Sequence, residues 1–241
     1  MSNHRFHEAQ PLTVGADVEL SAETVQHIRA LRLQSGASVV LFNGDGCDYA
    51  GTLTLQGKKH ALVTIESNRE VDNESPISVS LGIGMSLGDR MEYAIQKATE
   101  LGAVAIMPLA TERSELRLKG ERAEKKQQRW QQIAVSAAEQ CGRARVPPVH
   151  APQALTDWLA QVPLTDLRLV LHPEEGLSLR DMPAPLSVTA LIGPEGGLSE
   201  EDLGLAIKAG FTPAALGPRV LRTETAPVAL LSAVQTLWGD Y

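Results

Sequence analysis

The sequence predicts an α/β fold in which a small β-rich amino-terminal domain precedes a larger domain built on a mostly parallel sheet. Two observations predict this fold. Across residues 39–65, short runs rich in β-branched and aromatic residues alternate with turn sequences at 43–46 and 56–59. After Pro76, strand-like apolar runs alternate with helix-like segments, an order typical of a mostly parallel sheet.

The amino-terminal domain also contains a short predicted helix and ends at a polar linker. The helix begins after Ser21, a good N-cap residue, and carries apolar residues at helical spacing. The stretch 68–76 is polar and ends in proline, so it is the best linker in the chain. We therefore expect two domains, residues 1–72 and 73–241.

The larger domain is expected to begin with a strand at 77–85, a helix capped by Asp89 and stopped by Gly102, and a second strand at 103–109. Farther along, the spacing predicts a long polar helix over about 121–140, a helix around 154–162, and strands at 167–172 and 187–192.

The carboxyl-terminal segment is the most informative part of the sequence. The strand at 187–192 runs into a glycine-rich turn, Gly193–Gly197, and then into a helix capped by Ser199 and ended by Gly210. A second irregular turn at 217–219 precedes a final helix. Its apolar residues mark one face, at positions 226, 229, 230, 233, 234 and 237.

Composition excludes several classes of protein. The 241 residues are 43% hydrophobic and 21% charged, which is typical of a globular enzyme and not of a disordered chain. No apolar run approaches the roughly 20 residues that cross a bilayer, and the start lacks a secretion signal, so we expect a cytoplasmic protein without a membrane partner. The two cysteines and six scattered histidines lack metal-ligand spacing, so no metal is expected.

The net charge of −7 conceals an uneven distribution. Residues 1–72 carry six Lys/Arg against nine Asp/Glu, and residues 151–241 carry five against eleven. Residues 111–150 differ, with nine Lys/Arg against five Glu. This basic strip is either a phosphate-facing surface or a solvated helix with alternating charges, and the sequence leaves both interpretations open.

A ligand site is expected where the two turns meet. Ligands of open α/β sheets collect at the carboxyl ends of strands, and both turns lie at such ends. Their glycines let backbone groups approach a ligand closely, which suits either an adenine edge or a phosphate. A tight structural connection would need the same glycines. The P-loop, Rossmann and hydrolase-elbow motifs are missing.

Three side chains near the turns invite a chemical interpretation. Arg222 and Glu224 precede the final helix, and we expect Thr223 or Thr225 to be its N-cap. That role for a threonine would leave Arg222 and Glu224 without a structural task. His172 ends an apolar strand and is interpreted as pocket wall, since a histidine there is more often packed than catalytic.

Two strings carry a family resemblance: IGPEGGLSEEDLGLAIKAGF and ALGPRVLRTETA. Together with QKATELGAVAIMPLATERSE, AAEQCGRARVPPV and HIRALRLQSGASVVLFNGDGCDYAG, they resemble the RsmE-type RNA methyltransferases of the SPOUT superfamily. That family methylates N3 of a specific uridine in 16S (small-subunit) ribosomal RNA. The resemblance covers essentially the whole chain. It implies a SPOUT trefoil-knot methyltransferase domain preceded by a small PUA-like β-barrel domain.

The resemblance also implies a cofactor, S-adenosylmethionine, bent within the knot. The positions that match the family would hold it: His172, Gly193, Glu195, Gly196, Leu216, Gly217, Leu221 and Arg222. The uracil N3 proton must leave before or during attack. Glu224 or Glu195 would act as a general base, or Arg222 would stabilise negative charge developing on the uracil oxygens. We favour Arg222, with Glu224 either the base or the group that orients it.

The expected partners are small-subunit ribosomal RNA or the 30S particle and a second copy of the chain. With a homodimer, the basic strip gains a use in RNA binding. The RNA-binding candidates are Arg113, Arg129, Arg143 and Arg145, with Arg29 and Arg32 weaker. A noncatalytic RNA-binding protein of the same fold is the main alternative. A phosphate-binding α/β enzyme is less favoured, since Glu195 would repel a phosphate and no lysine follows the turn.

Overall fold

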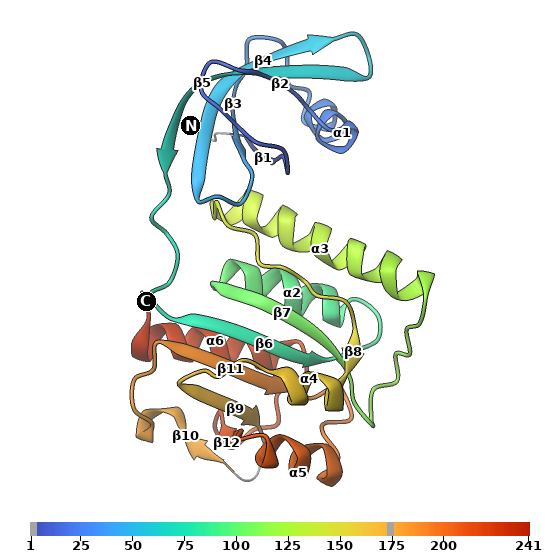
Figure 1. Cartoon of the computed structure of the whole chain (residues 1–241), viewed down its shortest axis with the longest axis vertical. Helices are drawn as coiled ribbons and strands as arrows, with labels where there is room; N and C mark the ends of the chain where they lie inside the picture. The colour runs from blue at the N-terminus through green and yellow to red at the C-terminus, as the bar shows by residue number, and fades with distance from the viewer. Residues whose placement is uncertain (1–3, 173–175) are drawn as a thin grey trace. The chain divides into compact units, whose positions relative to one another are not determined.

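The computed structural model describes residues 4–172 and 176–241, which form two compact units (Figure 1). Unit 1 contains residues 1–73 and 138–146, and unit 2 contains residues 74–137 and 147–241. The predicted α/β class is confirmed, because unit 1 is built on a mixed sheet and unit 2 on a parallel sheet with helices. None of the described helices is long and apolar enough to cross a bilayer.

Unit 1 is a five-stranded sheet with one helix, and its strand order is β1-β3-β4-β5-β2. Strands β1 and β3 are parallel, whereas β3, β4, β5 and β2 pair antiparallel. One face packs a core with Ile28 of the helix, Leu41 and Leu53 among its fully buried members. The elements are β1 (His4–His7), β2 (Asp17–Glu19), α1 (Ala22–Ala30), β3 (Ser38–Phe42), β4 (Cys47–Gln56) and β5 (His60–Glu70).

Local interactions explain why the helix and the β3–β4 turn of unit 1 lie at the positions that the sequence predicted. The Ser21 hydroxyl accepts a hydrogen bond from the Thr24 backbone N–H at 3.2 Å, so it caps α1 as expected. Gly44 and Gly46 adopt positive φ angles of 94° and 95° in the turn that joins β3 to β4. Residues 138–146 belong to this unit because Ala138 and Ala144 pack against Phe42. The short strands β1 and β2 were not predicted, since each is only one or two side-chain alternations long.

Unit 2 is a seven-stranded sheet of order β10-β12-β9-β11-β6-β7-β8, and every pair of described strands in it is parallel. The alternation predicted after Pro76 is therefore confirmed. The strands are β6 (Ser78–Gly84), β7 (Ala103–Ala110), β8 (Gln153–Ala154), β9 (Leu167–Leu171), β10 (Leu177–Ser178), β11 (Ser187–Ile192) and β12 (Thr212–Ala215). The helices are α2 (Arg90–Glu100), α3 (Glu121–Cys141), α4 (Leu155–Gln161), a 3-10 turn (Leu179–Asp181), α5 (Glu200–Lys208) and α6 (Thr225–Trp238).

Helices cover both faces of this sheet, as Figure 1 shows for α2 and α6 on one side and α4 and α5 on the other. Trp158 of α4 and Phe211, which follows α5, pack on buried strand residues such as Leu191 and Val170. Because both faces are covered, the central strands read as continuous apolar runs, as parallel strands usually do. The order of the strands brings the ends of β9, β11 and β12 side by side.

Two predicted caps turn out differently. Helix α2 begins after Asp89, but the Asp89 side chain forms no capping hydrogen bond with a described residue. At α6 the N-cap position is Glu224, and among the described residues neither Thr223 nor Thr225 caps the helix, so that expectation was wrong. The predicted Ser199 cap is confirmed, because its hydroxyl accepts from the Asp202 backbone N–H at 3.1 Å.

Candidate functional site

A pocket of about 740 Å³ opens at the carboxyl ends of β9, β11 and β12 in unit 2. The two turns predicted to meet do meet, because the pocket is lined by the glycine-rich turn 193–197 on one side and by residues 216–217 and 219–224 on the other. Apolar side chains of Leu171 and Ile192 contribute to its wall. The position is the usual one for a ligand in an open parallel sheet.

The turn 193–197 requires glycine for packing as well as conformation. A Cβ at Gly193 would lie 2.9 Å from the Leu198 backbone nitrogen, closer than such atoms approach. Gly197 adopts a φ of +68°, and its N–H donates to the Pro194 carbonyl at 2.9 Å, which closes the turn. The backbone of the three glycines thus forms part of this wall of the pocket.

The opposite wall is fastened to the turn by Thr223. Its hydroxyl donates to the Gly193 carbonyl at 2.9 Å and lies 3.3 Å from the Ser86 hydroxyl, beyond the end of β6. Both Thr223 and Ser86 are buried. Thr223 therefore has a use that the capping interpretation missed: it joins the segment before α6 to the ends of β11 and β6.

Glu195 is held by a second set of contacts. Its Oε1 accepts from the Leu87 backbone N–H and from Nη1 of Arg90, each at 2.8 Å. Burial raises the pKa of Glu195, but hydrogen bonds from the backbone and from Arg90 outweigh it and leave the pKa below its ordinary value. The hydrogen bond to Glu195 in turn raises the pKa of Arg90. This carboxylate is thus committed to holding the turn in place.

Glu224 lies between two guanidinium groups. Its Oε2 is 3.9 Å from Nε of Arg90, and its Oε1 is 4.0 Å from Nη1 of Arg222. Within the described part of the chain, Oε2 is buried without a hydrogen-bond partner. The Arg222 side chain is 81% exposed, so its guanidinium is accessible from the pocket opening.

Comparisons with known proteins agree with this architecture. The family model described as RNA methyltransferase domain matches residues 73–235, and the one described as RNA methyltransferase PUA domain matches residues 20–66. The ribosomal RNA small subunit methyltransferase E of Bacillus subtilis is 34% identical over 236 residues, covering 92% of each chain. The chain belongs to the ribosomal RNA small subunit methyltransferase E family.

Two solved structures extend the likeness to three dimensions. Methyltransferase E from Neisseria gonorrhoeae, bound to S-adenosyl methionine, is 38% identical with a TM-score of 0.93 and 99% of each chain covered. A Legionella pneumophila protein solved in complex with the same cofactor is 39% identical with a TM-score of 0.96 and 100% of each chain covered. The fold of this methyltransferase E family member is thus that of two cofactor-bound structures.

All the residues that were predicted to hold a cofactor or act in catalysis line the one pocket. The structure brings them together from three separate segments of the chain: His172, Gly193, Glu195, Gly196, Leu216, Gly217, Leu221, Arg222 and Glu224. Their contact with a ligand stays a prediction.

The residues predicted to bind RNA are divided between the two units. Arg113 lies at the pocket, where its Nη1 donates to the Gly196 carbonyl at 3.1 Å. Arg129 pairs with Glu92 at 3.4 Å, and Lys126 pairs with the same carboxylate at 3.0 Å. Part of the basic strip 111–150 is therefore a solvated helix face whose charges are paired, which is one of the two interpretations that the sequence left open.

The remaining RNA candidates belong to unit 1. The Arg143 side chain is buried, which keeps it from a phosphate in this conformation, whereas Arg145 is exposed. Arg29 donates to the Gly57 carbonyl, and Arg32, two residues beyond the end of α1, has a positive φ of 56°. These positions are exposed and stay candidates for RNA contact.

Sequence reasoning missed Arg90. Its position was the available signal, because it opens a helix just after the end of strand β6, at the same sheet edge as the two turns. No group of His, Cys, Asp and Glu side chains among the described residues could hold a metal ion.

Proposed function

We propose that this chain transfers a methyl group from S-adenosylmethionine to N3 of a specific uridine in 16S (small-subunit) ribosomal RNA. The observation that carries the proposal is the closing of two glycine-bearing segments, 193–197 and 216–224, around one pocket at the edge of a parallel sheet. Membership in the methyltransferase E family and the two cofactor-bound structural relatives support it.

The pocket residues fit S-adenosylmethionine. A volume of about 740 Å³ lies within the range of about 300–1,000 Å³ typical of small-molecule sites. Gly193 and Gly196 line the pocket and would offer backbone groups to an adenine edge, and Leu216 and Leu221 offer apolar walls. The residues that would hold the cofactor are His172, Gly193, Glu195, Gly196, Leu216, Gly217, Leu221 and Arg222. When bound, it supplies a methyl carbon activated by a sulfonium.

The catalytic work of the chain is to position the uracil and stabilise its developing charge. Arg222 is exposed at the pocket and reaches outward, so its guanidinium would donate to a uracil oxygen as N3 loses its proton. Glu224 would orient Arg222 through their ion pair. Glu195 is less suited to act as the base, since its Oε1 already accepts two hydrogen bonds.

Recognition of RNA would be shared between the domains, 1–72 and 73–241. The PUA-like domain would bring the substrate to the pocket, where Arg113 is placed beside Gly196. Arg29, Arg32, Arg129 and Arg145 would add phosphate contacts. A base paired in a helix cannot reach the pocket, which favours the 30S particle with a presented uridine over free oligonucleotides.

The finer fold that we propose is a SPOUT trefoil knot. It is supported by the path of residues 216–224, which return from β12 to the ends of β11 and β6 through the Thr223 contacts.

A homodimer is supported by exposed apolar side chains on unit 2 that a second copy would cover, Tyr93 and Val220 among them. An enzyme with this substrate would act in the cytoplasm.

Two measurements test the proposal. Calorimetry should show binding of S-adenosylmethionine to the full chain at micromolar concentration, and phosphate compounds should not compete. Mass spectrometry of ribosomal RNA from a deletion strain should lose one methyluridine, and the purified chain should restore it. A chain that binds the cofactor but leaves the RNA pattern unchanged would instead be a noncatalytic RNA-binding protein.

A further inference from the structure

Unit 1 has a hollow of about 320 Å³ on the face of its sheet opposite the core. Side chains alternate along a strand, and Val39, Leu41 and Tyr49 point into the core. Val40, Asp48 and Ala50 lie between or beside them and so face the other way. We call this pocket the outer-face hollow; Val40, Asp48, Ala50, Ser67, Asn68 and Arg69 line it.

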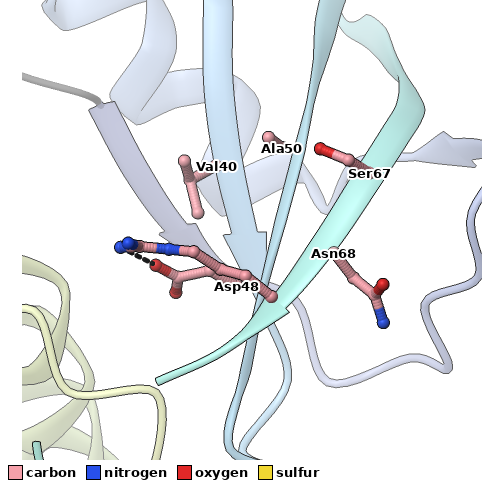
Figure 2. A pocket seen from close by; sticks show the side chains of 6 residues that line it. Val40, Asp48, Ala50, Ser67 and Asn68 are labelled. Carbon is pink, nitrogen blue, oxygen red and sulfur yellow. Dashed lines mark hydrogen bonds and ion pairs between the residues drawn. The ribbon is translucent and has the colours of Figure 1, made fainter. Parts of the chain in front are cut away.

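Figure 2 shows how the lining is divided. Val40 of β3 and Ala50 of β4 form a small apolar wall, and Ser67 of β5 lies beside Ala50, its cross-strand partner, while the Asn68 side chain points away from them. The Asp48 carboxylate is directed away from Asn68 and is joined to a guanidinium by a dashed line. The hollow therefore combines a flat apolar wall, neutral hydrogen-bonding groups and charge.

The charges in the hollow leave one exposed positive group. Asp48 is 5% exposed and accepts two hydrogen bonds from Nη1 of Arg5, at 2.5 and 2.6 Å. Nη2 of Arg69 reaches the same carboxylate at 3.3 Å. Arg5 is nearly buried and neutralises Asp48, whereas Arg69 is 78% exposed. The surplus positive charge of the cluster is therefore presented to solvent by Arg69.

Charges of both signs surround the hollow. The guanidinium of exposed Arg145 lies against Gly46, and the carboxylates of Asp45 and Glu70 act on the same neighbour of Asp48, the Cys47 thiol. The Arg5 guanidinium also donates to the Arg143 carbonyl at 3.0 Å, which fixes residues 138–146 beside the hollow. Among the lining residues Arg69 is the exposed cation, so a phosphate would be drawn to its guanidinium.

The size and chemistry of the hollow suit one nucleotide. Its volume is at the lower end of the range of about 300–1,000 Å³ for small-molecule sites, so it takes a single ring system with its attachments. An arginine whose edge is fixed by a carboxylate presents its flat face, on which unpaired RNA bases stack, and its remaining N–H groups to a phosphate. The Ser67 hydroxyl, which shares the face of its cross-strand partner Ala50, can hydrogen-bond the edge of that base.

We propose that the outer-face hollow binds one unpaired nucleotide of the RNA substrate, with the base against Val40 and Ala50 and the phosphate on Arg69. The proposal rests on the proposed function for the identity of the RNA. It places the principal RNA contact of unit 1 at Arg69 rather than at Arg29 and Arg32.

The experiment compares single substitutions in the full chain. Binding of a labelled small-subunit RNA fragment is followed by fluorescence anisotropy between about 50 and 200 mM salt. Arg69→Ala should weaken binding about fivefold to tenfold and reduce the slope of log affinity against log salt by about one. Ser67→Leu fills the hollow without changing charge, so it should weaken binding and leave the slope as in the parent. Lys208→Ala, an exposed charge on α5, serves as the charge-matched control and should bind as the parent does.

Several results would overturn the proposal. Parent-like affinity and slope in both Arg69→Ala and Ser67→Leu would remove the hollow from RNA binding. A loss in Arg32→Ala alone would place the contact on the α1 side of the domain. Binding of free uridine monophosphate as tight as that of the RNA would make the hollow a site for small nucleotides.

The two proposals fail in different ways. Calorimetry with S-adenosylmethionine should give the parent value for both hollow variants, because the cofactor pocket lies in unit 2. Parent-like thermal unfolding of both variants shows that unit 1 folds. If the parent does not bind the cofactor, the proposed function fails. If it does bind the cofactor and methylates RNA while the hollow variants retain full RNA affinity, only the hollow proposal fails.

Discussion

Replacing Thr223 with valine tests whether the two walls of the pocket are held together by one hydroxyl. Valine keeps the shape of threonine and removes the donor to the Gly193 carbonyl, at 2.9 Å, and the contact with Ser86, at 3.3 Å. The site is buried, with Thr223 only 7% exposed. A neutral hydrogen bond contributes about 0.5–1.5 kcal/mol, and a buried carbonyl left unsatisfied costs about 1–3 kcal/mol. We therefore expect the free energy of unfolding to fall by about 1–2 kcal/mol.

The same substitution should weaken cofactor binding. Gly193 and the segment 216–224 line the pocket from opposite sides. Without the Thr223 hydrogen bond between them, part of the binding free energy of the cofactor must be used to hold the two sides in place. A deficit of about 1.4 kcal/mol corresponds to a tenfold higher Kd, which sets the upper end of the expected change.

Urea denaturation and calorimetry with S-adenosylmethionine measure the two effects. Thr223→Ser keeps a hydroxyl and should recover much of both losses, and Thr225→Val, two residues along and exposed, is the matched control. If Thr223→Val has the free energy of unfolding and the cofactor Kd of the parent, the hydrogen bond to Gly193 does not hold the pocket together and the reasoning is wrong.

Three further substitutions probe other parts of the site. Arg222→Ala should fold like the parent, because an exposed ion pair at 4.0 Å contributes little, yet turnover should fall about 10²-fold; parent-level turnover would contradict its role. Gly193→Ala would place Cβ 2.9 Å from the Leu198 nitrogen, so calorimetry should show weaker cofactor binding, whereas an unchanged Kd would mean that the turn yields. Because the folded-state pKa of Glu195 lies below its ordinary 4.5, its contribution to stability is present above pH 4.5 and is lost as the pH falls through the folded pKa. Glu195→Gln should remove this loss of stability at acid pH. If the free energy of chemical unfolding depends on pH in the same way in parent and variant, Glu195 does not contribute the stability assigned to it.

The elements that the sequence predicted well are those whose signals are local. Hydrophobic spacing and a capping serine predicted where α1 and α5 begin, and Gly210 predicted where α5 ends. The alternation of strands and helices after Pro76 indicated the parallel sheet of unit 2 for the same reason. The two-residue strands β8 and β10 have no such signal, since they are too short for any periodicity to show.

The pocket residues were predicted because the turns carry glycine and lie at strand ends, and a general rule on open sheets relates such ends to ligands. The rule could not say that Glu195 binds Arg90 or that Thr223 bonds Gly193, 30 residues away. Such contacts depend on which strands are neighbours, and chain order does not give the order β12-β9-β11-β6.

By itself the sequence determined the longer elements, the class of fold and the segments that carry the chemistry, since these follow from nearest neighbours along the chain. Only the tertiary structure decided which arginine side chains are exposed to solvent, which are paired with a carboxylate and which are buried. The same residue type is buried at Arg143, paired with a carboxylate at Arg129 and exposed at Arg222, and the sequence does not distinguish the three positions. They differ because packing fixes the distance of each guanidinium from a carboxylate and from water, and those distances decide what an arginine can bind.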